Sequence, residues 1–293
     1  MESLRELLKN AAEILKSSGN SDTPILDAEV ILIYVLKESG MKYDRVKLVT
    51  HQGQLLDHKL AVRYRSLVEE RSKGKPVQYI TNIQEFMGLE LYIEQGVLIP
   101  RADTELIVER VLKLASGIER PRIIDMCTGS GAIAVSLGRS IPGSQLWAVD
   151  ISDAAVKCCR INSERLGLEK RIRIVKSDLF ENIREEGPDG KADIIVSNPP
   201  YIKSDVIPGL GINVRDYEPH LALDGGKDGI LYYKSIIRDS IEFLRKDGYL
   251  VFEVGYDQGA EVKAIMEESG YYGDVNIEKD LAGFDRCVWS QRI

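Results

Sequence analysis

The chain has 293 residues, of which 44% are apolar and 29% are charged, as expected for a folded protein of one large domain or two modest ones. This length excludes a disulfide-stapled mini-protein, and the net charge of −7 argues against a broad surface for duplex DNA. The four cysteines form no CxxC pair, which fits reduced thiols. The first fifteen residues alternate charge with leucine at helical spacing, so we expect a cytoplasmic protein without a signal peptide or membrane segment.

The first 80 residues show helical periodicity. One predicted face carries the apolar side chains Leu4, Leu7, Leu8, Ala11, Ile14 and Leu15. Further helices are expected from Pro24 to Leu36 and over residues 55–71, and the sequence of residues 73–76 then breaks the pattern. The sequence therefore predicts a small all-α bundle over residues 1–84, followed by a linking β-hairpin at 85–98 around Gly88.

Residues 99–293 alternate between apolar strands and helices. Strands are expected at 122–126, 145–149, 172–175, 192–196 and 249–254, with helices at 132–139, 152–166 and 230–244. This alternation is typical of an α/β domain with a parallel sheet that helices cover on both faces. Residues 275–277 and 286–289 lie too close in sequence for a crossover helix, so we expect the last strand to be antiparallel.

A glycine-rich turn joins the first expected strand of this region to its helix. It comprises Cys127, Thr128, Gly129, Ser130 and Gly131, and it directly follows Asp125 and Met126. Glycines let a ligand lie against bare backbone, and the pattern G-x-G-x-x-A matches the weak dinucleotide-binding fingerprint. A turn that merely joins a strand to a helix is the structural alternative.

Asp150 ends the next expected strand, 25 residues after Asp125. A carboxylate at this position can accept both hydroxyl hydrogens of a ribose, which NAD and S-adenosylmethionine share. A strand-terminal aspartate can also simply cap a turn.

The apolar residues 194–196 lead, through Ser197, into Asn198, Pro199, Pro200 and Tyr201. The prolines remove two backbone donors and fix φ, which leaves carbonyl oxygens at the strand end where α/β folds bind ligands. The Asn198 side chain adds an acceptor and Tyr201 adds an aromatic face. These groups together suit a planar NH2 group, held by two acceptors and stacked on the ring, although a double proline also stiffens any strand exit.

With Asn-Pro-Pro-Tyr, the chain resembles the NPPY methyltransferases, and within them most closely the PrmC/HemK family of N5-glutamine methyltransferases. The similarity extends over most of the chain. It includes residues 74–80, Pro100-Arg101-x-Asp103-Thr104-Glu105, Tyr217-Glu218-Pro219, residues 221–226 and Phe252-Glu253-Val254-Gly255 with Gln258. The resemblance implies a class I S-adenosylmethionine-dependent methyltransferase: a Rossmann-like, seven-stranded, mostly parallel sheet with an antiparallel last strand, after the helical bundle and hairpin.

The resemblance also implies the site. Cys127, Thr128, Gly129, Ser130 and Gly131 would cradle S-adenosylmethionine, with Asp150 on its ribose, Asp178 and Leu179 beside its adenine, and Asn198 next to it. Asn198, Pro199, Pro200 and Tyr201 would bind the substrate amide, and Asn198, Pro199 and Tyr201 would act in catalysis. This chain departs from the family at Cys127, where glycine is usual, at Leu179, where many members have tryptophan, and at Ala102, where proline is usual.

The expected reaction moves a methyl group from S-adenosylmethionine to N5 of the glutamine in the Gly-Gly-Gln loop of peptide chain release factors, leaving S-adenosylhomocysteine. The expected partner is therefore a class I release factor, bound by a monomer whose helical domain docks it, without direct sequence-specific binding to nucleic acid. We expect no metal, since His51 and His58 are placed on one exposed helix face and His220 in a loop. An adenine-N6 DNA methyltransferase and a non-catalytic protein-binding module remain as alternatives.

Overall fold

The computed structural model describes residues 2–293, which form two compact units. The helical unit comprises residues up to 83 together with 210–217, and the sheet unit comprises 84–209 and 218–293. Residues 210–217 were expected in the methyltransferase region that begins at residue 99. In the structure this segment packs within the helical unit, where a Cβ atom on Gly74 would lie 2.5 Å from Ile212 Cγ2.

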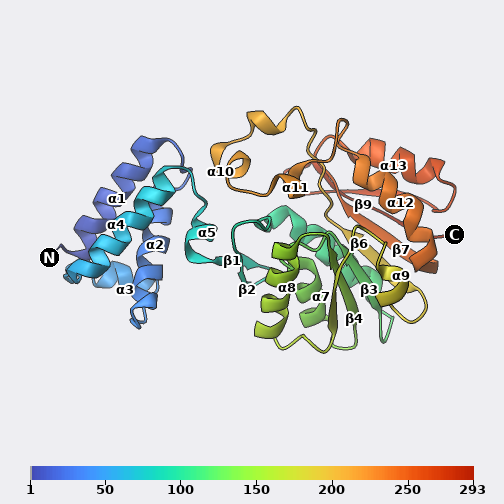
Figure 1. Ribbon diagram of the computed structural model, residues 1–293, viewed down its shortest axis with the longest axis horizontal. Helices are drawn as coiled ribbons and strands as arrows, with labels where there is room; N and C mark the ends of the chain where they lie inside the picture. The colour runs from blue at the N-terminus through green and yellow to red at the C-terminus, as the bar shows by residue number, and fades with distance from the viewer. Residues whose placement is uncertain (1) are drawn as a thin grey trace. The chain divides into compact units, whose positions relative to one another are not determined.

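Five helices and one later segment make up the helical unit (Figure 1). They are α1 (Leu4–Ser18), α2 (Pro24–Glu38), α3 (Arg45–Thr50), α4 (His58–Ser72), α5 (Val77–Thr81) and α10 (Ile212–Arg215). A reciprocal capping box starts α1: the Ser3 hydroxyl accepts from the Glu6 backbone N–H, and the Glu6 carboxylate accepts from the Ser3 backbone N–H. Ile14 was expected on the buried face of α1 but is 49% exposed, because it lies at the edge of the apolar stripe.

The helix predicted from residue 55 begins at His58, since the Asp57 side chain caps it by accepting from the Lys59 N–H. This cap overturns one expectation. His51 follows the last residue of α3 and His58 opens α4, so the two histidines do not share a helix face.

The hairpin pairs β1 (Ile83–Phe86) with β2 (Leu89–Tyr92), and it starts two residues earlier than predicted. Its turn residues Met87 and Gly88 have φ values of 50° and 70°, the left-handed conformation of a two-residue hairpin turn that suits the strand twist. The Asn162 side chain on α8 (Asp153–Arg165) bonds both the N–H and the C=O of Tyr92.

The sheet unit is built on seven strands in the order β5-β4-β3-β6-β7-β9-β8. They are β3 (Arg122–Met126), β4 (Gln145–Asp150), β5 (Ile172–Lys176), β6 (Ala192–Ser197), β7 (Leu244–Glu253), β8 (Asn276–Lys279) and β9 (Asp285–Gln291). β3 to β7 pair in parallel, whereas β9 is antiparallel to both of its neighbours. The predicted mostly parallel sheet with an antiparallel last strand is confirmed.

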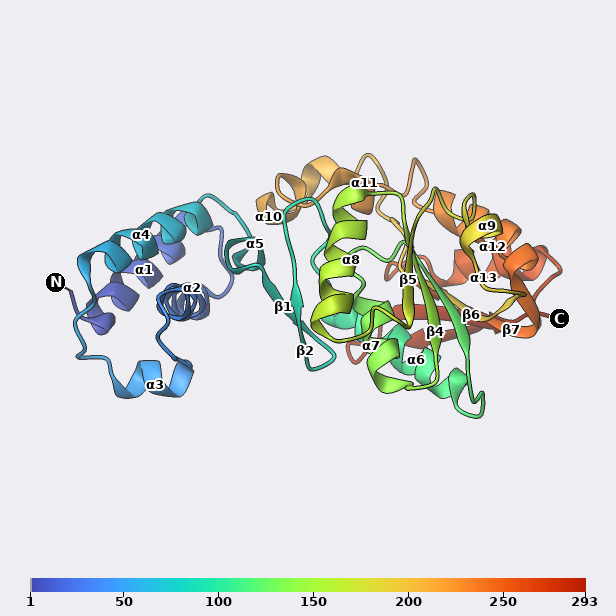
Figure 2. The same ribbon diagram turned by 60° about the horizontal axis from the view of Figure 1, so that its bottom comes forward.

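Helices cover both faces of this sheet, as Figure 2 shows. One face carries α6 (Glu105–Ala115), α7 (Ala132–Ser140) and α8; the other carries α9 (Ile183–Glu186), α12 (Leu231–Phe243) and α13 (Gly259–Glu268). Short helical turns lie at η1 (Ala102–Thr104), η2 (Ile207–Gly209) and α11 (His220–Leu223). His220 therefore opens a helix rather than lying in a loop as expected.

Most predicted strands end within one or two residues of those observed, but β7 starts at Leu244 instead of 249. Its first half is polar, and Asp247 has a φ of 61° beside an irregularity in the pairing with β6. No helix within residues 2–293 is both long and apolar enough to cross a lipid bilayer.

Candidate active site

A cavity of about 610 Å³ opens at the carboxyl ends of the parallel strands of the sheet unit. The residues after β3, β4, β5 and β6 line it, as expected for ligand sites in α/β sheets. Of the sequence-predicted site residues, the lining includes Cys127, Thr128, Gly129, Ser130, Asp150, Asp178, Leu179, Asn198 and Pro200. Residues that are far apart in the chain thus line one cavity.

The glycine-rich turn adopts left-handed φ values at three positions. These are 61° at Cys127, 55° at Gly129 and 82° at Gly131. At Gly131 a side chain is excluded, since a Cβ atom would lie 2.6 Å from the Sγ of Cys159. Asp125 links the turn to the start of α7, because its carboxylate accepts from the Thr128 hydroxyl in the turn and from the Ala134 N–H in the helix.

Asp150 ends β4 at the cavity wall, and both of its carboxylate oxygens are anchored. Oδ2 accepts from the Gly129 N–H at 2.8 Å and Oδ1 from the Ser152 N–H at 2.9 Å. A carboxylate has about four acceptor positions, so each oxygen keeps capacity for a further hydroxyl. Burial raises the pKa of Asp150, against the opposing effect of these two N–H donors.

Asp178 and Leu179 follow β5 and also line the cavity. Asp178 is exposed, while Leu179 packs against the apolar core with a φ of 43°. This position thus presents an aliphatic surface, where an aromatic ring would offer a flat face for stacking.

Asn198 directly follows β6, and its side-chain nitrogen donates to the hydroxyl of Thr104 at 3.2 Å. The side-chain oxygen has no bond among the described residues and is left as an acceptor beside the cavity. Thr104 lines the same cavity and is 4% exposed. Its role was not predicted, although it lies in the quoted Asp-Thr-Glu sequence.

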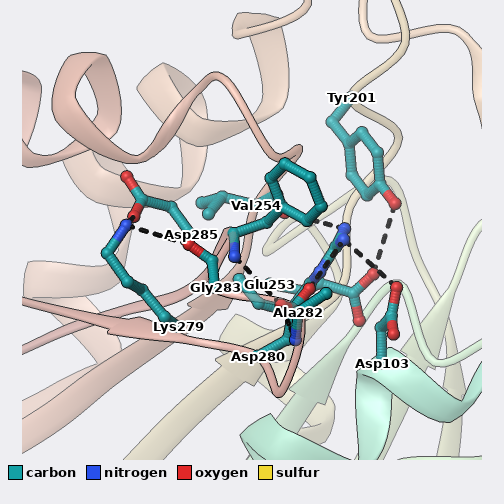
Figure 3. A network of polar contacts seen from close by, with 11 residues as sticks. Asp103, Tyr201, Glu253, Val254, Lys279, Asp280, Ala282, Gly283 and Asp285 are labelled. Carbon is teal, nitrogen blue, oxygen red and sulfur yellow. Dashed lines mark hydrogen bonds and ion pairs between the residues drawn. The ribbon is translucent and has the colours of Figure 1, made fainter.

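Pro199 is buried, and neither it nor Tyr201 is among the described residues that line the cavity. The Tyr201 hydroxyl instead donates to Glu253 at 3.3 Å (Figure 3). Burial raises the pKa of Tyr201, and the neighbouring Glu253 charge adds to the rise. Stacking of the Tyr201 ring on a substrate stays a prediction.

Glu253 was also missed as part of the site. It ends β7 and is 1% exposed, and burial raises the pKa of its carboxyl to about 7 against the opposing influence of Thr104, Arg286 and Tyr201. A carboxyl group that ends an apolar run such as Leu250–Phe252 is the sequence signal that identifies it.

Two further segments, residues 225–229 and 255–258, contact the backbone after Asn198, and no role was predicted for either. The buried Gln258 side chain donates to the Tyr201 and Gly229 carbonyls and accepts from the Gly255 N–H. At Gly225 a Cβ atom would lie 2.7 Å from the Cα of Tyr201. Residues 225–229 and 255–258 therefore fix the position of the Asn-Pro-Pro-Tyr loop.

Ion pairs fix the loop that carries Thr104. Arg101 pairs with the buried Glu218, and Arg286 on β9 pairs with Asp103 at 3.1 Å and with Asp280 at 3.3 Å. Figure 3 shows Asp103 close to the Tyr201 hydroxyl and Glu253. Within residues 2–293, no three or more His, Cys, Asp or Glu side chains are grouped to hold a metal ion.

Comparisons with known proteins show the family of this chain. Residues 6–81 match the family described as PrmC N-terminal domain, and residues 102–208 match Methyltransferase small domain. The chain is 38% identical to proteins named "Release factor glutamine methyltransferase" from Clostridium acetobutylicum and Moorella thermoacetica, over 99% of this chain and 98% of each relative.

Among solved structures, the hMettl16 catalytic domain in complex with MAT2A 3′UTR hairpin 1 has a TM-score of 0.54 and 17% identity, covering 88% of this chain and 90% of that one. This likeness concerns the fold, that of class I S-adenosylmethionine-dependent methyltransferases. Full-length similarity to the curated relatives carries the assignment: the chain belongs to the release factor glutamine methyltransferase family.

Proposed function

We propose that this enzyme transfers the methyl group of S-adenosylmethionine to the side-chain nitrogen of the glutamine in the Gly-Gly-Gln loop of class I release factors. The names of its full-length relatives support this substrate. The observation that carries it is the Asn198 amide, whose nitrogen is bonded to Thr104 and whose oxygen is left beside the cavity. An acceptor at this position suits the NH2 of an amide.

The cavity fits the proposed cofactor. The residues that would hold S-adenosylmethionine are Cys127 to Gly131, Asp150, Asp178 and Leu179. Three features support the fit: the left-handed turn, an Asp150 carboxylate with acceptor capacity to spare for two hydroxyls, and the volume of about 610 Å³. When bound, this group supplies an electrophilic methyl carbon, whose bond to sulfur breaks as the bond to nitrogen forms and leaves a neutral thioether.

The residues of the chain would act on the substrate amide. An amide nitrogen is a poor nucleophile because its lone pair is delocalised. The Asn198 side-chain oxygen and the Pro199 carbonyl would accept its two hydrogens, orient it, and stabilise the positive charge that develops. Tyr201 would add about 0.5 to 2 kcal/mol if its ring lies on that charge. The methylated nitrogen is then acidic enough to lose one proton to water, so no dedicated base is needed.

We also propose the roles of the other parts: the helical unit docks the release factor, the hairpin links it to the methyltransferase region, and the protein works as a cytoplasmic monomer. The separation of the helical unit from the sheet unit that holds the whole cavity supports this division. Sedimentation of the protein alone and with a release factor checks both the oligomeric state and the docking.

The deciding experiment incubates the protein with S-adenosylmethionine and a purified release factor, then locates added methyl groups by peptide mass mapping. We expect one methyl on the glutamine of the Gly-Gly-Gln peptide. Bare DNA serves as the parallel substrate, because an adenine NH2 would fit the same acceptors. Equal transfer to DNA, or none to the peptide, contradicts the proposal.

A further inference from the structure

The antiparallel strand β9 brings an arginine to the edge of the sheet where the parallel strands end. Because β9 runs against β7, its first residues lie beside the last residues of β7, and Cys287 pairs there with Glu253. Arg286 precedes Cys287, and its side chain is only 12% exposed. A parallel strand would have placed its first residues at the opposite edge of the sheet. The strand direction thus puts a cationic group close to the site.

Contacts within the C-terminal part of the chain fix the Arg286 guanidinium. Its Nη2 atom pairs with Asp280 at 3.3 Å, and Nη1 lies 3.5 Å from the Val254 carbonyl oxygen. Asp280 is itself held by the turn before β9, because its carboxylate accepts from the N–H groups of Ala282 and Phe284 at 2.9 and 3.0 Å. The position of the guanidinium is therefore set by neighbours that follow it or precede it closely in the sheet.

The same Arg286 nitrogen reaches Asp103 on η1. Nη2 lies 3.1 Å from the Asp103 carboxylate, and Figure 3 shows the two side chains facing each other. An Nη2 atom carries two hydrogens, so it can donate to Asp280 and to Asp103 at once. The Asp103 side chain is 50% exposed, far more than that of Arg286. The ion pair therefore restrains Asp103 more than it restrains Arg286.

Asp103 lies at the centre of residues 101–105, which we call the anchor segment. Four of its side chains contact four different parts of the sheet unit. These contacts join Arg101 to Glu218, Asp103 to Arg286, Thr104 to Asn198, and Glu105 to the Met87 N–H. Both ends of the segment are held without Arg286. Loss of the Asp103 contact should therefore leave the segment folded but let its centre move.

Thr104 transmits such a movement to the site. It follows Asp103 directly, is 4% exposed, and has its Oγ1 atom 3.2 Å from Asn198 Nδ2. When that contact is lost, the Asn198 side chain can turn to other rotamers. A displacement of about 1 Å in a group that aligns the reactants can cost about 100-fold in rate.

We propose that Arg286 is a positioning residue for methyl transfer. It holds Asp103, and with it Thr104, so that the Thr104 hydroxyl stays within hydrogen-bond distance of the Asn198 side chain. The inference rests on the proposed amide methylation, and it adds to it a residue of β9 that is not among the described residues lining the cavity. It also gives the antiparallel direction of β9 a consequence for the reaction.

The test measures kcat and KM for both substrates in Asp103→Asn, Arg286→Gln and the double variant. Each single change should lower kcat about 10- to 100-fold and leave KM for S-adenosylmethionine nearly unchanged, because neither removes a group of the cofactor site. The double variant should be no slower than the slower single variant, since both changes break one contact. Arg286→Lys, which keeps the charge, should be faster than Arg286→Gln.

Two results of these measurements would overturn the inference. They are a wild-type kcat in Asp103→Asn, and losses that multiply in the double variant. Arg286→Gln also removes the contact with Asp280 and could unfold the turn before β9, whereas Asp103→Asn leaves that contact in place. The result for Asp103→Asn therefore decides even if Arg286→Gln does not fold.

Glu278→Gln is the matched control. Glu278 on β8 pairs with Arg110 on α6, so this change also replaces an acid by its amide in an ion pair that joins β8 and β9 to the region of the anchor segment. Neither Glu278 nor Arg110 is among the described residues that line the cavity. We expect a wild-type kcat. Equal losses in Glu278→Gln and Asp103→Asn would mean a general loosening and would contradict a specific role of Arg286.

A second measurement needs no release factor. The hydrogens of the Asn198 side-chain NH2, assigned in NMR spectra by their loss in Asn198→Ala, should exchange with water faster in Asp103→Asn and Arg286→Gln than in the wild type and Glu278→Gln. The reason is that the contact with Thr104 is broken more of the time. Equal exchange in all four proteins would refute the inference. Exchange that differs as expected, in a protein that methylates no release factor, would refute the proposed function alone.

Discussion

The two units differ in how completely their buried polar groups are hydrogen-bonded. In the helical unit the buried Asp27 accepts from Arg71 at 2.7 Å and from the hydroxyls of Ser21 and Thr23, and the buried Tyr64 hydroxyl donates to the Ala28 carbonyl. In the sheet unit Asp125, Glu218 and Glu253 each keep a buried oxygen without a partner. Every such unpartnered side-chain atom within residues 2–293 belongs to the sheet unit.

We infer from this contrast that buried polar groups mainly serve stability in the helical unit and mainly serve activity in the sheet unit. Burying an unpaired polar atom costs free energy, so the unpartnered atoms of the sheet unit do not contribute to its stability. Asp125 and Glu253 lie directly behind the glycine-rich turn and the Asn-Pro-Pro-Tyr loop, where they hold functional backbone and side chains in place. Substitutions in the helical unit should therefore reduce stability, and those in the sheet unit should first reduce activity.

The largest effect on stability is expected from Asp27→Ala. It leaves the charge of Arg71, whose side chain is 9% exposed, buried without its carboxylate, which typically costs about 3 to 5 kcal/mol. Urea unfolding should show the helical unit melting early, while binding of S-adenosylmethionine to the sheet unit persists. The double variant Asp27→Ala/Arg71→Leu should regain much of the loss. If Asp27→Ala has the same free energy of unfolding as the wild type, the Asp27–Arg71 ion pair does not stabilise the helical unit.

Of the substitutions proposed, Asn198→Ala should cause the largest loss of activity, and it should change the free energy of unfolding little. Loss of the acceptor for the substrate NH2 should lower kcat by about 10² to 10³, by analogy with the removal of one group that stabilises transition-state charge. Calorimetric titration should find much of the cofactor affinity retained. Unchanged turnover would refute the acceptor role of Asn198.

Asp125→Asn should change the pH dependence of stability. Burial raises the pKa of Asp125 to about 7 from an ordinary 3.8, so between these values the folded state binds the proton more tightly than the unfolded state. The free energy of unfolding should therefore fall as pH rises from about 4 to 7, by at most about 1.4 kcal/mol per pH unit for this group. Urea unfolding of Asp125→Asn at pH 4.5, 6 and 7.5 should show a shallower fall; Glu253, with a pKa also raised to about 7, accounts for a remainder. An identical slope in the variant would show that Asp125 does not titrate in this range.

Cys127→Gly should have the smallest effect and should be favourable. A side chain with a φ of 61° is strained by about 1 to 2 kcal/mol, from which the greater unfolded-state entropy of glycine subtracts about 0.5 to 1. We expect a gain of about 0.5 kcal/mol in unfolding free energy and tighter binding of S-adenosylmethionine, because the turn gains room at the cavity. Weaker binding would mean that the thiol itself contacts the cofactor.

The sequence predicted what depends on short stretches of chain. The glycine-rich turn, Asp150 and Asn198 each end an apolar strand, and the alternation of strands and helices places such ends at one edge of a parallel sheet. The bond from Asn198 to Thr104 joins residues 94 apart, and the one from Tyr201 to Glu253 joins residues 52 apart, so no local pattern specifies either.

The incorrect predictions have the same origin. The three-and-four spacing of apolar residues ran through residues 55–57, although the helix begins only after its cap at Asp57. The seven-residue spacing of His51 and His58 predicted a shared helix face, but α3 ends before His51 and α4 begins at His58. β7 starts five residues earlier than predicted because Leu244 pairs with Ala192 of β6, ahead of an irregularity in that pairing that spans the polar residues Arg245 to Asp247.

The grouping of residues 210–217 with the helical unit has a consequence for how the chain is made. The ribosome delivers α1 to α5 first, but the segment that packs against Gly74 emerges only after most of the sheet unit, roughly ten seconds later at ~5 to 20 residues per second. During that interval the first helices exist as an incomplete nascent domain. The helical unit can therefore complete its packing only after the ribosome has synthesised residues 210–217.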